Sequence, residues 1–184
     1  MNTISLKYFK KDKSIRGRNL LVFILWEITN FFILKNWLCT SYSFKRFILR
    51  LFGAKLGKDV IIKQGVNIKY PWKLKIGDYS WIGEEVWIDN IENIEIGANV
   101  CISQGVYLCT GNHDWDKKHF PLVAKGIVIE EGVWIGAKAI ICPGIKCRSH
   151  SVLTIGSMAV HNLEPYKVYQ GNPAVCKKDR VIND

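Results

Sequence analysis

The sequence predicts a mainly β fold, a parallel β-helix of six-residue repeats that runs from about residue 54 to residue 160. A branched aliphatic residue returns at nearly every sixth position, and a small or branched residue follows it four positions later. Glycine or an acidic residue often stands directly after the aliphatic. The repeating series is Leu56, Ile62, Ile68, Ile76, Ile82, Ile88, Ile96, Ile102, Leu108, Ile129, Ile135, Ile141, Cys147 and Leu153.

A period of six excludes simple strand alternation and the 3.6-residue period of an α-helix. A triangular coil does have this period, because each hexad forms one flat side and one corner, and about three hexads close a coil. The phase slips by two residues at Pro71-Trp72 and again after Ile88, and it breaks for longer at residues 112–126. An ordinary alternating all-β domain is the alternative, but it would not keep this phase from Leu56 to Leu153. We therefore expect stacked coils with a projecting loop at 112–126.

Residues 1–53 precede the repeat and are expected to form a basic and apolar helical extension, before a β-helix domain at 54–184. Much of the net charge of +10 lies here, in Lys7, Lys10, Lys11, Lys13, Arg16, Arg18, Lys45, Arg46 and Arg50. The run from Leu20 to Leu34 is apolar but contains Glu27, and a membrane span needs roughly 20 apolar residues. We expect helices that pack on the main domain or on a neighbouring subunit. Attachment to a membrane surface through the basic flanks is the alternative.

Composition restricts the other functional classes. The six cysteines form no CxxC pair and no Cys/His zinc spacing, so we expect reduced thiols, no metal and a cytoplasmic protein. Nucleic acid is a poor partner, because the basic residues gather near the N-terminus without a binding motif.

Several segments carry a narrower resemblance. The hexads resemble the left-handed β-helix, hexapeptide-repeat acetyltransferases over about residues 54–178, and particular segments resemble the bacterial exopolysaccharide O-acetyltransferases of the colanic acid type. These segments are Trp81-Ile82-Gly83-Glu84, Trp87-Ile88-Asp89-Asn90, Cys101-Ile102-Ser103-Gln104-Gly105, Cys109-Thr110-Gly111-Asn112-His113-Asp114, Trp134-Ile135-Gly136-Ala137, Pro143-Gly144 and Gly171-Asn172-Pro173-Ala174.

The resemblance implies a left-handed coil and transfer of an acetyl group from acetyl-CoA to a sugar hydroxyl in exopolysaccharide, capsule or O-antigen biosynthesis. It also implies a homotrimer with active sites between neighbouring prisms, and a saccharide acceptor partly covered by loop 112–126. The expected place of action is the cytoplasm, with attachment to the inner face of the membrane left open.

The motif Thr110-Gly111-Asn112-His113 identifies His113 as the general base by this resemblance, and a neutral histidine suits that role. Asp89, Asn90, Asp114 and Trp115 are expected to bind the acceptor. A plain corner turn remains the alternative for Asp89 and Asn90. Either Asp114 or Asp116 is expected to orient the His113 ring, as a carboxylate does in catalytic triads.

The expected acetyl-CoA contacts lie on the later coils and in the tail, and they are Trp134, Gly136, Ala137, Ile155, Gly156, Lys177 and Lys178. The two lysines would meet the CoA phosphates, although a solvated basic tail is an equal alternative. The corner Thr154-Ile155-Gly156-Ser157 departs from the Gly-Ala-Gly-Ser common in relatives, which puts the Ile155 contact in doubt.

Three other functions compete with sugar O-acetylation. N-acylation of an amino sugar or nucleotide sugar uses the same fold, and a non-enzymatic trimeric scaffold is a second alternative. A carbonic anhydrase of the same coil needs three zinc histidines, and the four histidines present do not have that spacing.

Overall fold

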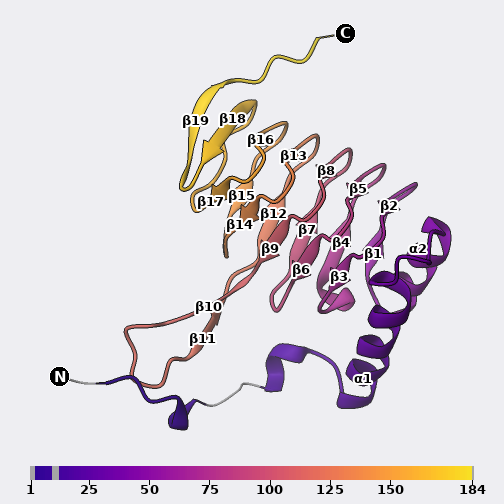
Figure 1. Cartoon of the computed structure of the whole chain (residues 1–184), viewed down its shortest axis with the longest axis vertical. Helices are drawn as coiled ribbons and strands as arrows, with labels where there is room; N and C mark the ends of the chain where they lie inside the picture. Colours follow the sequence, from indigo (N-terminus) through magenta and orange to yellow (C-terminus); the bar gives the residue numbers. More distant parts are fainter. Residues whose placement is uncertain (1–2, 10–12, 184) are drawn as a thin grey trace.

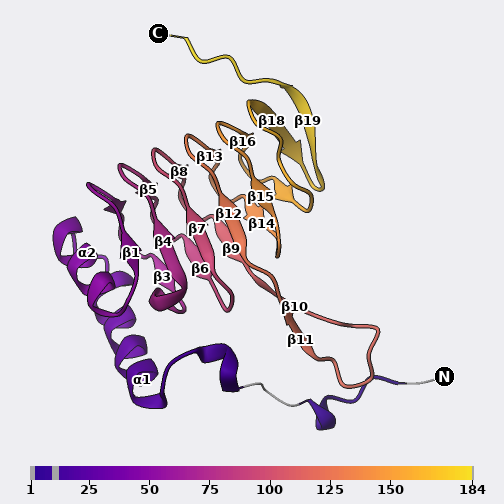
Figure 2. The same ribbon diagram turned by 180° about the vertical axis from the view of Figure 1, so that it is seen from behind.

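A computed structural model of the chain describes residues 3–9 and 13–183. Lys10 and Lys11 of the expected basic cluster lie outside the described residues. Within them, three sheets wrap around one axis to form a triangular prism, as Figures 1 and 2 show from opposite sides. The predicted parallel β-helix is confirmed.

The three sheets take one strand from each coil. Sheet A contains β1 (Lys55–Leu56), β4 (Leu74–Ile76), β7 (Ile94–Ile96), β12 (Ile127–Ile129) and β15 (Lys146–Cys147). Sheet B contains β2 (Ile61–Ile62), β5 (Trp81–Ile82), β8 (Cys101–Ile102), β13 (Trp134–Ile135), β16 (Val152–Leu153), β18 (Lys167–Gly171) and β19 (Ala174–Asp179). Sheet C contains β3 (Asn67–Ile68), β6 (Trp87–Asp89), β9 (Tyr107–Cys109), β14 (Ile140–Ile141) and β17 (Met158–Ala159). Neighbouring strands are parallel except for β18 and β19.

The coils have two lengths. In the early coils Ile62 pairs with Ile82, 20 positions away, whereas in the late coils Ile135 pairs with Leu153, 18 positions away. The two extra residues lie at the corner between sheets C and A, which we call the third corner. There the first coil makes a short 3-10 helix at Pro71–Lys73. The phase slips in the sequence therefore mark real additions to one corner of the prism.

The repeating aliphatic residues fill the prism. Ile62, Ile82, Ile102 and Leu153 are at most 1% exposed, while Leu56, in the first strand of the prism, is half-buried. The glycine that follows an aliphatic residue allows neighbouring coils to approach closely. Its role does not depend on an unusual backbone conformation. A Cβ atom on Gly77 would lie 2.6 Å from the backbone of the next coil. Left-handed φ angles occur two residues further on, as at Tyr79.

Two helices close the first end of the prism, as Figure 1 shows. Helix α1 (Leu20–Thr29) continues as a π-helical turn (Asn30–Leu34), and α2 (Tyr42–Leu51) follows. Trp26 is fully buried and donates its indole N–H to the Ile68 carbonyl at 2.8 Å. The buried Lys45 ammonium donates to the carbonyls of Ile62 and Lys63 at 3.3 and 2.8 Å. These contacts satisfy backbone groups that an open coil would leave unpaired, and they confirm the helical N-terminal part.

The expected loop is an antiparallel hairpin of β10 (Gly111–His113) and β11 (Leu122–Ala124). It projects from the third corner, and the N-terminal segment passes beside its tip in both views (Figures 1 and 2). The Ser5 N–H donates to the Lys118 carbonyl at 2.9 Å. In the part of the chain that the structure describes, no helix combines the length and apolar character needed to cross a membrane.

Candidate active site

Buried hydrogen bonds of Thr110 at the third corner set the direction of the hairpin. Thr110 is fully buried, and its hydroxyl donates to the Asp89 carbonyl at 2.8 Å while it accepts from the Glu92 N–H at 3.1 Å. The Lys125 N–H donates to the Thr110 carbonyl at 2.9 Å and closes the base of the hairpin. His113 therefore stands at a fixed height above the coil, although it belongs to a projecting loop.

The His113 ring is held by the opposite strand of its own hairpin. Its Nδ1 lies 2.8 Å from the Phe120 carbonyl oxygen, and its ring stacks on the Phe120 ring at 4.3 Å. A carbonyl only accepts hydrogen bonds, so in the neutral ring Nδ1 carries the proton and Nε2 keeps its lone pair. This tautomer suits a base that acts through Nε2. Phe120 has a φ of 48°, a left-handed conformation that bulky residues rarely adopt.

The expectation that Asp114 or Asp116 orients this ring is wrong. The Asp114 carboxylate pairs with Lys117 at 3.0 Å, and Asp116 is exposed. The hydrogen-bond partner of Nδ1 is the Phe120 carbonyl oxygen instead. A backbone carbonyl suffices to fix the tautomer without placing a negative charge beside the ring.

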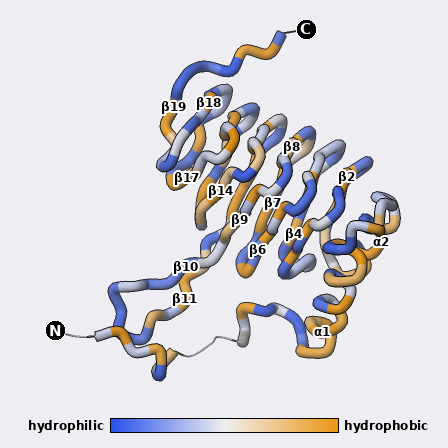
Figure 3. Tube along the Cα trace, viewed as in Figure 1, coloured by the Kyte–Doolittle hydropathy of each residue, from blue (hydrophilic) through white to orange (hydrophobic). Residues whose placement is uncertain are grey.

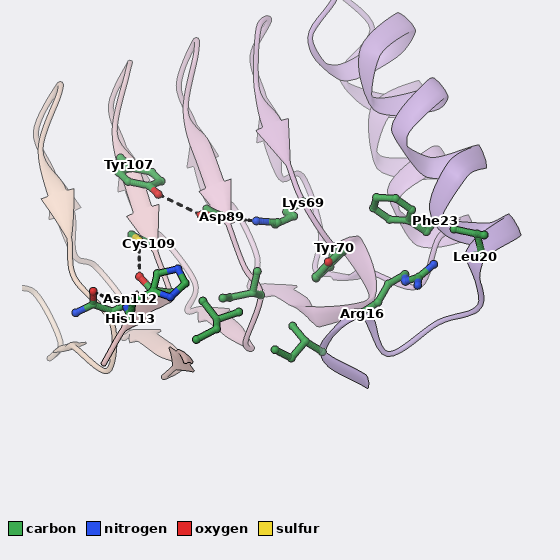
Figure 4. A pocket seen from close by; sticks show the side chains of 14 residues that line it. Arg16, Leu20, Phe23, Lys69, Tyr70, Asp89, Tyr107, Cys109, Asn112 and His113 are labelled. Carbon is green, nitrogen blue, oxygen red and sulfur yellow. Dashed lines mark hydrogen bonds and ion pairs between the residues drawn. The ribbon is translucent and has the colours of Figure 1, made fainter. Parts of the chain in front are cut away.

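The first cavity beside His113, which we call the helix-side cavity, has a volume of about 620 Å³. Figure 4 shows its lining, in which Arg16 and His113 lie far apart. The lining residues are Ile15, Arg16, Leu20, Phe23, Lys69, Tyr70, Asp89, Ile91, Tyr107, Cys109, Gly111, Asn112, His113 and Leu122. This volume falls in the range of small-molecule sites, roughly 300–1,000 Å³.

Asp89 is the centre of a polar group on the wall of this cavity. Its carboxylate pairs with the Lys69 ammonium at 2.7 Å and accepts from the Tyr107 hydroxyl at 3.1 Å (Figure 4). Burial raises the pKa of Tyr107 far above its usual range, and hydrogen bonds to Cys109 and Asp89 add to this rise. Tyr107 therefore remains a neutral donor at all physiological pH values.

Asn90 does not have the expected acceptor-binding geometry. It is fully buried, its amide oxygen accepts from the Tyr70 N–H at 2.9 Å, and its amide nitrogen donates to the Tyr70 carbonyl at 2.6 Å. Both ends of the amide are thus occupied by the coil below. The corner interpretation fits Asn90, while Asp89, one residue earlier, points into the cavity.

A second cavity of about 590 Å³ lies on the other side of the hairpin, and we call it the late-coil cavity. Asp114 and Trp115, two of the expected acceptor-binding residues, line it together with Cys142, Pro143 and Val160. Asn112 and His113 line both cavities. The expected acceptor residues therefore divide between the two sides of His113.

The expected cofactor residues lie elsewhere on the prism. Gly136, Ala137, Ile155 and Gly156 stack at the second corner, between sheets B and C, where the Gly156 N–H donates to the Ala137 carbonyl at 2.9 Å. A Cβ on Gly136 would lie 2.5 Å from the Ile155 nitrogen.

The other expected cofactor residues project from sheet B. Trp134, on β13, is half-exposed and donates its indole N–H to Ser103 at 3.0 Å. Lys177 and Lys178 are exposed on β19. One chain therefore does not bring these cofactor residues to His113, which projects from the third corner.

Sequence reasoning missed Arg16, Lys69, Tyr107 and the Phe120 carbonyl. The 20-residue spacing of the early coils would have identified Lys69. Lys69, Asp89 and Cys109 follow one another at 20-residue intervals and stack in register. No comparable signal marks Arg16 or a backbone carbonyl.

All six cysteines lie in the described part of the chain, and none forms a disulfide. Within that same part, no group of three His, Cys, Asp or Glu side chains is placed to hold a metal ion.

Comparison with known proteins finds acyltransferases. No family model matches the chain. It is 40% identical, over 96% of its length and 97% of the relative, to the putative colanic acid biosynthesis acetyltransferase WcaF of Escherichia coli. A hexapeptide-repeat acetyltransferase of Vibrio cholerae, complexed with acetyl-CoA, has a TM-score of 0.81 at 21% identity and covers 96% of both chains. The N-acyltransferase AntD of Bacillus cereus, in complex with dTDP and 3-hydroxybutyryl-CoA, has a TM-score of 0.63 at 20% identity, covering 74% of this chain and 88% of its own.

Proposed function

The chain belongs to the hexapeptide-repeat acetyltransferases of the colanic acid type, and we propose that it acetylates a sugar hydroxyl with His113 as the general base. It is an acyltransferase that uses acetyl-CoA, and its relative WcaF is named a putative colanic acid biosynthesis acetyltransferase. The observation that carries the proposal is the position of His113, which lines both cavities with Nδ1 already bonded to Phe120.

The reaction follows from this tautomer. The acceptor hydroxyl gives its proton to His113 Nε2 as its oxygen attacks the thioester carbonyl carbon, so an ester C–O bond forms. The C–S bond breaks, and the departing CoA thiolate takes the proton from His113. The histidine returns to its starting state, and the transfer requires neither a metal nor an oxidant. The Phe120 carbonyl steadies the ring while it carries the proton, because it accepts from Nδ1–H in both states.

We place the acceptor in the helix-side cavity and the thioester in the late-coil cavity. The oxygens of Asp89 and Tyr107 have lone pairs that can accept from sugar hydroxyls, the Lys69 ammonium has further N–H donors, and all three residues line the helix-side cavity. The late-coil cavity lies on the opposite side of His113 and is lined by Cys142, Pro143 and Val160 of the later coils. With this arrangement His113 stands between the two reacting groups, which is the placement that lowers the entropic cost of bringing them together.

We propose that the active unit is a homotrimer. The cofactor residues at the second corner and His113 at the third corner belong to different edges of one prism, so a site that contains both requires a second copy. Trp81, Trp87 and Trp134 project from sheets B and C and are 53, 44 and 48% exposed, which is a large aromatic area for a free surface. Light scattering after size exclusion should give three times the monomer mass of 21.1 kDa, and a monomeric mass in the active preparation would exclude this arrangement.

The general-base proposal is tested by His113→Ala, with His119→Ala on the same hairpin loop as the matched control. Release of CoA in the presence of an acceptor saccharide should fall by about 10²- to 10⁴-fold in His113→Ala, and remain near wild type in His119→Ala. Both variants should keep the wild-type oligomer mass. Undiminished transfer by His113→Ala would refute the mechanism, and the absence of any transfer by the wild type across saccharide acceptors would favour a trimeric scaffold.

N-acylation is the second candidate function, and the likeness to AntD favours considering it. The two functions differ in the product, since an ester is cleaved by mild alkali whereas an amide is not. Paired acceptors that differ only in an amino or hydroxyl group at one carbon would decide between them by which one becomes acetylated.

The exposed side of the N-terminal helices supports a further part of the proposal. Figure 3 shows this end of the molecule as largely hydrophobic. We call the following residues, each at least 44% exposed, the apolar helical face: Leu20, Leu21, Ile24, Leu25, Ile28, Phe31, Phe32, Trp37 and Leu38. Exposed Arg18 and Lys35 flank it. We propose that this face rests on the inner, cytoplasmic surface of an anionic membrane, because apolar insertion with basic flanks is how surface helices bind lipid.

Sedimentation with vesicles tests the membrane contact. The wild type should sediment with phosphatidylglycerol vesicles at low salt and less with phosphatidylcholine vesicles. Phe31→Ser with Phe32→Ser should abolish sedimentation, whereas the control Val181→Ser, at the opposite end of the prism, should not. Loss of the wild-type oligomer in the double variant, without any vesicle binding by the wild type, would assign the face to a contact between copies.

A further inference from the structure

Among residues 3–9 and 13–183, Arg16 has no carboxylate partner. Its Nη1 is shielded from solvent and has no hydrogen-bond partner, and no ion pair reaches its side chain from residues 3–9 or 13–183. Its guanidinium lies 5.4 Å from the centre of the Phe23 ring. A charged donor that is shielded from water without gaining a hydrogen-bond partner is costly, so such a group in a cavity wall points to a ligand.

The position of Arg16 is fixed by the fold. Its carbonyl accepts from the Trp72 indole N–H at 2.7 Å, which ties this part of the N-terminal segment to the first coil. Gly17 follows with a φ of 68° and lets the chain turn away towards α1. The side chain is therefore held at the cavity rather than on a free tail.

The charges of the cavity do not cancel. Lys69 is neutralised by Asp89 at 2.7 Å, so Arg16 supplies the remaining positive charge. Burial raises the pKa of Tyr70, the positive charges of Lys69 and Arg16 act to lower it, and the carboxylates of Glu27 and Asp89 act to raise it; Glu27 does not line the cavity. Figure 4 shows Arg16 beside Tyr70 at the end of the cavity away from His113.

We infer that the acceptor carries a negative charge and that Arg16 binds it. The inference rests on the proposed function, since it assigns a substrate class to the same site. The planar guanidinium is suited to a carboxylate or a phosphate, which it binds through two parallel hydrogen bonds. The anionic group would lie at the helix-side end while the hydroxyl to be acetylated lies at His113. The charge is either a carboxylate of a hexuronic acid or a phosphate at the reducing end of the sugar.

Binding measured by calorimetry tests the inference without turnover, and the full-length His113→Ala protein serves as the host. The probes are a methyl hexopyranosiduronate, the neutral methyl hexopyranoside that differs only in the carboxylate, and the hexose 1-phosphate. At least one anionic probe should bind more tightly than the neutral sugar. Adding Arg16→Gln should weaken that probe by about 10- to 100-fold and leave the neutral sugar unchanged, while Arg16→Lys restores part of the binding.

Arg18→Gln is the matched control, because Arg18 is exposed two residues away and does not line the cavity. Equal affinity for charged and neutral sugars, no binding of any probe, or the same loss in Arg18→Gln would overturn the inference. A preference confined to the uronate places the charge on the sugar ring, and one confined to the phosphate places it at the reducing end. Charge-selective binding without acetyl transfer by the wild type would refute the proposed function while leaving this inference standing.

Discussion

Asn90→Ala should lower the stability of the protein rather than its affinity for an acceptor. The substitution removes the acceptor of the Tyr70 N–H, at 2.9 Å, and one of the two donors to the Tyr70 carbonyl, at 2.6 Å; the Lys73 N–H still donates to that carbonyl at 3.0 Å. Asn90 is fully buried and Tyr70 is 6% exposed, so water does not replace them. The orphaned N–H costs about 1–3 kcal/mol and the lost second bond to the carbonyl about 0.5–1.5 kcal/mol, which gives a loss of about 1.5–4.5 kcal/mol in the free energy of unfolding.

A loss of that size lowers the melting temperature by about 3–18 °C, at about 2–4 °C per kcal/mol for a chain of this length. Thr110→Val is the companion variant, because Thr110 occupies the same corner one coil later and makes two hydrogen bonds through its hydroxyl. It should cost less, since valine keeps the shape of threonine and the only group it leaves unpaired is the N–H of half-buried Glu92; the Asp89 carbonyl keeps the Thr110 N–H as a donor at 3.3 Å. Asn112→Ala, on the exposed side of the hairpin, should change stability by less than about 0.5 kcal/mol.

The assay is thermal unfolding followed by circular dichroism, with acceptor KM measured on the same preparations below the transition. An unchanged melting temperature in Asn90→Ala, combined with a raised acceptor KM, would refute the corner role and restore the ligand role expected from the resemblance.

Three further outcomes are expected. Lys45→Met should cost about 1–3 kcal/mol because two first-coil carbonyls lose their donor. Burial lowers the pKa of Lys45 in the folded state below the 10.5 of an ordinary lysine, so the unfolded chain binds more protons between these two values. Urea titrations should therefore show that the stability difference between the wild type and Lys45→Met widens as pH rises towards 10.5. Gly136→Ala should destabilise by up to about 3 kcal/mol because its Cβ meets backbone at 2.5 Å, whereas Gly156→Ala, in open space with a φ of 64°, should cost about 1 kcal/mol by the same titration. Burial raises the pKa of Cys147 from 9.0 to about 12, so between these values the unfolded chain releases a proton that the folded chain keeps. The free energy of unfolding should therefore fall as pH rises through this window, and it should fall less in Cys147→Val.

The coil could be predicted from the sequence because its determinants are local. One position in six must be apolar and must fit the narrow interior, and Ile82 and Ile102 meet that condition without reference to distant segments. The hairpin boundary could be predicted for the same reason, since the phase stops where the chain leaves the prism. The role of the glycines could not be predicted in the same way, because the close approach at Gly77 depends on the coil stacked above it.

The site was predicted less completely because its contacts join segments far apart in the chain. The position of His113 follows from a motif, but its partner is the Phe120 carbonyl, and a carbonyl has no side-chain identity to recognise. Asp89 and Asn90 are neighbours of similar polarity, yet the strand turns one into the cavity and the other into the corner. Arg16 reaches the site only because Trp72, 56 positions later, holds its backbone.

The N-terminal segment connects the two surface proposals. Leu20 lines the helix-side cavity and also belongs to the apolar helical face, where it is 58% exposed. The mouth of the cavity therefore adjoins the face that we place on the membrane, with Arg16 four residues away. Since anionic lipids and an anionic acceptor would attract the same basic segment, salt should weaken both contacts together, whereas loss of the Arg16 charge should weaken the acceptor far more than the membrane. Only the acceptor depends on the directed geometry of one guanidinium, because the membrane meets many apolar side chains at once.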